Sequence, residues 1–139
     1  IDITKTTAPH AISYPLTKLF NIPHGYAVAL TLGHFFILNE KFDDQNLTDK
    51  RGKAYLKETM SELRNIFGCD SPETAFRYWY DFLDRCGLKV NLSELEIVSS
   101  DIKKILAGIN ADRLSNNPIK ISKNDIEKIL NDQLNYTLN

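Results

Sequence analysis

All three histidines of the sequence lie within residues 6–38, and two of them, His10 and His24, are spaced so that they could act together. Pro15 and Pro23 fall between them. Because proline interrupts a helix and favours the first turn of a new one, the stretch predicts a helix, a break and a second helix that opens at His24. Two imidazoles on separate elements joined by one turn can face each other, which is the arrangement that a metal site needs.

The residues alone do not establish such a site, because zinc and iron sites need three or four ligands and no third ligand lies at a suitable spacing. The D-x-x-x-H and H-x-x-x-H patterns, which place two ligands on one face of a helix, are both absent. The third histidine, His34, lies in the most apolar part of the sequence. We therefore expect His34 to be a core residue whose ring is hydrogen-bonded to a neighbouring carbonyl.

The composition indicates one globular domain and argues against several classes of partner. The 139 residues are 42% hydrophobic and 25% charged, and their net charge is −1. The basic residues are scattered, which gives no reason to expect binding to nucleic acid or to an anionic membrane. No apolar run is long enough to span a membrane. Cys69 and Cys86 do not form a CxxC pair, so we expect reduced thiols in a cytoplasmic protein.

The apolar periodicity and the capping residues predict an all-α domain of about six or seven helices. Residues 25–39 are apolar on nearly every side, as expected of a helix in the middle of a bundle. Ser71 followed by Pro72, and Ser122 followed by Asp125, are typical helix starts. A short β-favouring run opens the sequence, and no strand pair follows it. The expected helices cover residues 8–13, 25–39, 49–67, 72–86, 99–109 and a last segment after Ser122, with a kink or stop at Pro15 and a short piece at 92–98.

The segment HAISYPLTKLFNIPHGYAVALTLGHFFILN resembles the signature region of the iron-containing (group III) alcohol dehydrogenases. In that family one histidine ligand of the metal lies in the first part of this region, and another follows fourteen residues later in a P-H-G turn. His10 and His24 match these two positions. Near the other end, residues 110–118 resemble the family segment that ends in Asn-Pro. The resemblance covers essentially the whole chain and implies a dehydroquinate-synthase-like helical domain.

The resemblance implies half of an active site. The family's other two metal ligands, an aspartate and a histidine, and its glycine-rich cradle for the NAD(P) pyrophosphate belong to sequence before Ile1, and no GxGxxG run occurs here. We therefore expect residues 1–139 to be the C-terminal helical metal-binding domain of a larger two-domain enzyme, without its N-terminal NAD(P)-binding domain. The intact enzyme would hold Fe²⁺ or Zn²⁺, use NAD or NADP for hydride transfer with a small alcohol or aldehyde at the metal, and form a homodimer or larger assembly. The fragment alone would be inactive.

Tyr14 is the position at which the sequence departs from the family pattern. The family usually has a second histidine there, near the nicotinamide and linked to proton transfer, so Tyr14 either takes a catalytic role through its hydroxyl or simply packs with that hydroxyl satisfied. Sequences of the form H-A-I-S-Y-P-L-T resemble a branch that includes phosphonoacetaldehyde-type reductases. This implies an anionic aldehyde as substrate, with Lys5, Thr6 and Thr7 as candidate contacts to its anion.

Two other functions remain compatible with the sequence. A dehydroquinate-synthase-like lyase shares the two-domain architecture, although the P-H-G turn and the tail of the chain argue against it. A non-catalytic helical interaction module could have kept the scaffold and lost the chemistry. A dinucleotide-binding domain with a D-x-x-x-H pair upstream would favour the dehydrogenase over the module.

Overall fold

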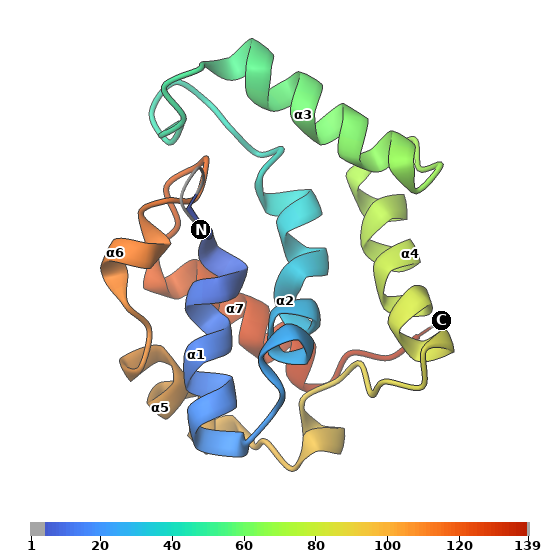
Figure 1. The fold of residues 1–139 in the computed structure, drawn as a ribbon. Helices are drawn as coiled ribbons and strands as arrows, with labels where there is room; N and C mark the ends of the chain where they lie inside the picture. Colours follow the sequence, from blue (N-terminus) through green and yellow to red (C-terminus); the bar gives the residue numbers. More distant parts are fainter. Residues whose placement is uncertain (1–4, 139) are drawn as a thin grey trace.

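The computed structural model describes residues 5–138, and its regular elements are helices (Figure 1). Seven α-helices and two short 3-10 helices occur in this part, which confirms the predicted all-α class and the number of helices. An isolated antiparallel bridge between Leu47 and Ile119 is the only β pairing among the described residues. The β-favouring run expected at the start falls on residues 1–4, outside the described ones. The helices are α1 (Ala8–Phe20), α2 (His24–Leu38), α3 (Lys53–Ile66), α4 (Pro72–Arg85), η1 (Ser93–Leu95), η2 (Ser99–Asp101), α5 (Ile102–Ala107), α6 (Ala111–Leu114) and α7 (Lys123–Leu134).

The sequence predicts a kink or a stop at Pro15, and helix α1 runs through this proline, so the stop is wrong. Pro15 lacks the N–H that would bond to the Ala11 carbonyl, which costs one helical hydrogen bond. Burial of the same region offsets this loss, because Ala11, Ile12 and Leu16 are fully buried and Pro15 is buried with them. The helix ends instead at Asn21, whose φ of 54° lies in the left-handed region that asparagine tolerates at a helix end.

Helix α2 lies in the middle of the fold, with α1 and α4 packed on either side of it (Figure 1). Its contact with α4 depends on Gly33, because a Cβ at this position would lie 2.5 Å from Cε2 of the Tyr80 ring. The close approach allows the Tyr80 hydroxyl to donate to the Leu30 carbonyl at 2.9 Å, and Nε1–H of Trp79 to donate to the Ala29 carbonyl at 2.9 Å. These bonds satisfy polar groups that would otherwise be costly to bury.

We expect Gly33→Ala and Gly25→Ala to change stability in opposite directions, although both residues lie in α2. An added Cβ at Gly33 meets the Tyr80 ring and forces a shift that costs about 1–3 kcal/mol. At Gly25 an added Cβ meets nothing within 4 Å, so alanine gains up to about 1 kcal/mol through its higher helix propensity. Chemical denaturation of the two variants measures the difference. Equal effects at the two positions would mean that α2 and α4 do not pack in this way.

Helix α3 begins at Lys53, later than the predicted start near Asp49. The cause is a local turn, in which the Asp49 carboxylate accepts hydrogen bonds from the backbone N–H and the guanidinium of Arg51. Gly52 then adopts a φ of 90°, which lies outside the helical region. Turns closed by an aspartate side chain compete with helix in this way, and apolar spacing does not reveal them.

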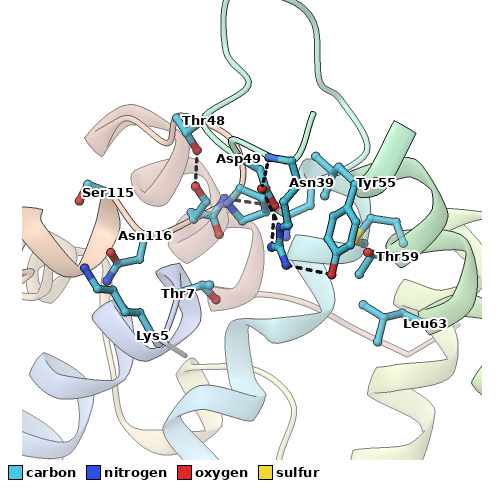
Figure 2. A pocket seen from close by; sticks show the side chains of 15 residues that line it. Lys5, Thr7, Asn39, Thr48, Asp49, Tyr55, Thr59, Leu63, Ser115 and Asn116 are labelled. Carbon is cyan, nitrogen blue, oxygen red and sulfur yellow. Dashed lines mark hydrogen bonds and ion pairs between the residues drawn. The ribbon is translucent and has the colours of Figure 1, made fainter. Parts of the chain in front are cut away.

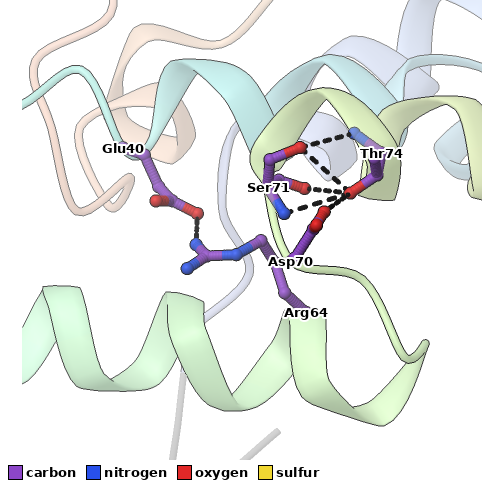
Figure 3. Close-up of polar contacts among 5 residues, drawn as sticks. All are labelled: Glu40, Arg64, Asp70, Ser71 and Thr74. Atoms are coloured by element: carbon purple, nitrogen blue, oxygen red, sulfur yellow. Dashed lines mark hydrogen bonds and ion pairs between the residues drawn. The ribbon is translucent and has the colours of Figure 1, made fainter.

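Polar contacts hold α3 near the end of α2 and cap the start of α4 (Figure 3). The Arg64 guanidinium of α3 forms an ion pair with Glu40, which follows α2. Helix α4 starts at the predicted cap, where the Ser71 hydroxyl accepts the Thr74 N–H at 3.2 Å and the Thr74 hydroxyl accepts the Ser71 N–H at 3.0 Å. Because both N–H groups lack helical partners, this reciprocal pair stabilises the start of α4.

The C-terminal part of the chain completes the core, with α5 and α6 against α1 and α7 against α2. The predicted short piece at 92–98 contains η1, and η2 leads directly into α5. The side chain of Asn110 caps the short helix α6 by accepting the N–H groups of Asp112 and Arg113. The predicted pair of Ser122 and Asp125 forms a capping box at the start of α7. The sequence signals for these starts are therefore confirmed.

Both cysteines, Cys69 and Cys86, are free thiols, as predicted. Within residues 5–138, none of the helices combines the length and the apolar character that crossing a membrane requires.

Candidate metal site

The structure brings His10 of α1 and His24 of α2 together. Nδ1 of His10 lies 3.2 Å from Nε2 of His24, and the two ring centroids are 5.3 Å apart. Two imidazole nitrogens bound to one tetrahedral ion lie about 3.3 Å apart, given metal–nitrogen bonds of about 2.0–2.1 Å. The two nitrogens therefore have the separation that a shared metal ion requires, and in its absence one ring N–H can donate to the other ring.

Ser13, which local sequence signals do not single out, fixes the tautomer of the His24 ring. The buried Ser13 hydroxyl donates its hydrogen to the His10 carbonyl at 2.8 Å, and its oxygen lies 3.2 Å from Nδ1 of His24. Because the hydroxyl has one hydrogen, Nδ1–H of His24 must donate to Ser13. The proton of the neutral ring is thereby held on Nδ1, which leaves the lone pair of Nε2 directed toward His10. Metal-binding histidines commonly have a hydrogen-bond partner that orients the ring in this way.

Tyr14 and Arg113 lie on the same face as the histidine pair. The Tyr14 ring centroid is 5.3 Å from that of His24, and the side chain is 43% exposed. The guanidinium carbon of Arg113, from α6, lies 4.0 Å from the centroid of the Tyr14 ring. Burial lowers the pKa of His10 below its usual 6.5, and the nearby charges of His24 and Arg113 lower it further. The ring of His10 is therefore neutral at physiological pH, as a metal ligand must be.

The pair supplies two of the positions around a metal ion. No group of three or more histidine, cysteine, aspartate or glutamate side chains gathers anywhere in residues 5–138. The donors present, two neutral imidazole nitrogens, suit Zn²⁺ or Fe²⁺ but do not complete a tetrahedral site. The residues thus fit half of the site that the sequence analysis expects.

His34 is a core residue, as predicted, and its contacts are separate from those of His10 and His24. Its Nε2 is 2.7 Å from Oε1 of Gln133, and its ring packs edge-on against Phe76 and Tyr80. The carbonyl partner belongs to a side chain of α7, 99 residues along the chain, which local sequence signals do not indicate. The Gln133 amide also donates to the Val90 carbonyl, so one buried side chain provides hydrogen-bond partners for both His34 and Val90.

The unfolding free energy should fall as the pH decreases from about 7.5 to 5. Burial lowers the pKa of His34 below its usual 6.5, although the hydrogen bond to Gln133 and the charge of Asp132 act in the opposite direction. The unfolded chain therefore binds more protons in this range, so the stabilisation is complete above pH 6.5 and is lost as the pH falls below it. His10 contributes with the same sign. Denaturation of His34→Gln and His10→Gln across this pH range separates the contributions of the two histidines. If both variants kept the pH dependence of the wild-type unfolding free energy, neither histidine would be its source.

The three candidate anion contacts do not join the histidine pair through their side chains. Lys5 and Thr7 line a cavity of about 570 Å³ between the start of α1, helix α3 and residues 115–118 (Figure 2). The Thr6 carbonyl accepts a hydrogen bond from the Asn116 side chain. Thr7 is the N-cap residue of α1, but its hydroxyl makes no capping bond.

One family model matches nearly the whole chain. The profile of the C-terminal part of the Fe-containing alcohol dehydrogenase family matches residues 2–134. Phosphonoacetaldehyde reductase from Streptomyces viridochromogenes is 25% identical over 134 residues, which cover 96% of this chain and 33% of that protein. The crystal structure of sulfoacetaldehyde reductase from Bifidobacterium kashiwanohense in complex with NAD⁺ shares the fold with a TM-score of 0.70 and 24% identity, over 96% of this chain and 32% of that one. The chain thus spans about a third of the length of these relatives.

Proposed function

We propose that this chain, which belongs to the Fe-containing alcohol dehydrogenase family, is the C-terminal metal-binding part of an NAD(P)-dependent alcohol dehydrogenase or aldehyde reductase. Three facts support the proposal: the family match, the third of the relatives' length that the chain spans, and the paired imidazole nitrogens 3.2 Å apart. The histidine pair is the central observation, because it supplies two metal ligands and the remaining ligands must come from elsewhere. We call the proposed longer protein, with its NAD(P)-binding domain, the two-domain enzyme.

In the two-domain enzyme His10 and His24 would hold Fe²⁺ or Zn²⁺ together with ligands from outside residues 5–138. When bound, the cation supplies Lewis-acid polarisation of the aldehyde oxygen, and NAD or NADP supplies or accepts the hydride. Ser13 would keep the lone pair of His24 directed at the cation by holding the proton on Nδ1. The lowered pKa of His10 favours the neutral ring that the cation needs.

Tyr14 is the candidate for proton transfer in the reaction. Its ring packs beside His24, and its exposure leaves the side chain accessible from the open face of the site. In the reductive direction the phenolic O–H would donate a proton to the substrate oxygen, and in the oxidative direction the same oxygen would receive it. Tyr14→Phe keeps the ring and removes only this hydroxyl.

The proposed substrate is a short aldehyde that carries an anionic group. The similarity to phosphonoacetaldehyde reductase over 96% of the chain supports this class. Lys5, Thr6 and Thr7 remain candidate contacts to the anion through the cavity that Lys5 and Thr7 line. Neither the lyase nor the interaction module is favoured by the relatives found. The free thiols further support a reducing compartment, so we place the two-domain enzyme in the cytoplasm and propose a homodimer or larger assembly.

The test compares the 139-residue chain with the two-domain enzyme. We expect the chain alone to bind Fe²⁺ or Zn²⁺ weakly and to show no turnover. The two-domain enzyme should reduce short aldehydes with NADH or NADPH, lose this activity to a chelator and regain it with Fe²⁺ or Zn²⁺. Tight, stoichiometric metal binding by the chain alone would refute the divided site.

Ser13→Ala should lower the metal affinity of the two-domain enzyme by roughly 10- to 100-fold. Without the hydroxyl, the neutral ring of His24 is free to move its proton to Nε2 and to rotate, and both changes weaken its ligand atom. Thr17→Val is the matched control, because the Thr17 hydroxyl is buried in the same helix and has no hydrogen-bond partner among residues 5–138. Competition with a chelator of known affinity measures the effect. Equal metal affinities for Ser13→Ala and wild type would show that Ser13 does not orient His24 for metal binding.

A further inference from the structure

Arg113 lies beside the histidine pair on a short helix whose start is capped by a side chain. Helix α6 is capped by the Asn110 side chain, which accepts the Arg113 N–H at 3.3 Å and the Asp112 N–H at 2.8 Å. The Arg113 guanidinium then lies 4.0 Å from the centroid of the Tyr14 ring, whose other neighbour is His24 at 5.3 Å. The distance from the guanidinium carbon to the centre of the His24 ring is therefore at most the sum of these two distances. A short molecule with a reactive group at one end and an anion at the other can bridge this distance.

The Arg113 guanidinium has no carboxylate partner among residues 5–138. The ion pairs in this part of the chain use Arg51, Lys53, Arg64 and Lys104. Arg51 gives an internal comparison, because its guanidinium also lies 4.0 Å over a tyrosine ring, that of Tyr55. The Arg51 guanidinium donates two hydrogen bonds to the Asp49 carboxylate, whose negative charge balances its own. Arg113 shows the same stacking without the carboxylate, and stacking on a ring face leaves its N–H edges able to bind an anion.

We propose that Arg113 binds the anionic group of the aldehyde substrate and thereby selects for a short aldehyde that carries a tetrahedral oxyanion, a phosphonate or a sulfonate. The inference rests on the proposed function, because it places the substrate oxygen at the histidine pair. The aldehyde end then faces His10 and His24, and the anionic end reaches the guanidinium past Tyr14.

The chemistry of the guanidinium fits this role. Its planar fork presents two parallel N–H groups that match two oxygens of a phosphonate or sulfonate, and such charge-assisted bonds are among the stronger hydrogen bonds in proteins. Arg113 is half-buried, so the bound anion would be only partly screened by solvent. A role limited to packing on Tyr14 would make no distinction between charged and uncharged substrates.

Substrate selectivity of Arg113→Met in the two-domain enzyme tests the proposal. The probes are phosphonoacetaldehyde, sulfoacetaldehyde and the uncharged propionaldehyde. We expect kcat/KM for the anionic aldehydes to fall roughly 10- to 100-fold, mainly through KM, while kcat/KM for propionaldehyde changes less than about threefold. Arg113→Lys should restore part of the loss, and the better of the two anionic probes identifies the anion. Arg85→Met removes one charge from α4, on the opposite side of the fold from α6, and should leave the selectivity unchanged.

Equal losses for charged and uncharged aldehydes, or no loss for either, would overturn the role of Arg113 while leaving the proposed function intact. Failure of the wild-type enzyme to reduce any aldehyde would instead count against the proposed function. In that case binding of methylphosphonate, measured by calorimetry, still decides the question for Arg113. Binding that Arg113→Met weakens roughly tenfold or more supports the anion site, and binding that is unchanged or undetectable in wild type refutes it.

Discussion

Replacing His24 by alanine is expected to lower the aldehyde-reducing kcat/KM of the two-domain enzyme by about 1,000-fold or more. The change removes Nε2, one of the two nitrogens 3.2 Å apart that we assign to the metal. His10→Ala should have a similar effect, and the double variant should be little worse than either, because each single change already disables the same site. Elemental analysis of the purified variants should show a loss of metal that parallels the loss of activity.

His34→Gln is the matched control for these variants. It also removes an imidazole from α2, but from the core, where the ring bonds to Gln133. We expect this variant to keep its metal and most of its kcat/KM at a temperature where it remains folded, as judged by circular dichroism. If His24→Ala retained metal and activity at the level of His34→Gln, the assignment of the pair would be wrong.

Gln133→Leu is expected to reduce the free energy of unfolding by about 2–4 kcal/mol. The buried Gln133 amide lies between Nε2 of His34 and the Val90 carbonyl, and leucine leaves both without their partner. The loss of two buried partners outweighs the gain of an apolar side chain of similar size, since unsatisfied polar groups in a core are costly. Urea denaturation of the 139-residue chain measures the change.

Asn131→Leu serves as the control in the same helix. Asn131 is exposed, and its side chain bonds only to the Glu127 carbonyl one turn earlier. Its replacement should change stability by less than about 0.5 kcal/mol. A Gln133→Leu variant as stable as Asn131→Leu would show that the bonds between α2, α7 and the segment around Val90 contribute little.

The fold could be predicted where local signals act alone. Ser71 with Pro72, and Ser122 with Asp125, mark helix starts through bonds within four residues. The stop predicted at Pro15 is wrong, because α1 is buried by its packing against α2, α5 and α6, which the local sequence does not show. The start of α3 was missed because an aspartate-closed turn at Asp49 displaces it.

The site was predictable only in part for the same physical reason. The meeting of His10 and His24 follows from two helices joined by one turn, which Pro23 indicates. Ser13 could have been found, since a serine three residues after His10 lies on nearly the same face of the helix. Arg113 could not, because α6 reaches Tyr14 only through the tertiary packing of α1 against α6. The bond of His34 to Gln133 spans 99 residues and was likewise beyond local reasoning.

The most direct test is a crystal structure of the two-domain enzyme grown with Fe²⁺ or Zn²⁺, with anomalous diffraction recorded at the absorption edge of the metal. We expect one metal ion per chain, with nitrogen ligands from both His10 and His24 at about 2.0–2.2 Å. An ion held elsewhere, or an ion at this place bound by neither imidazole, would contradict the metal site.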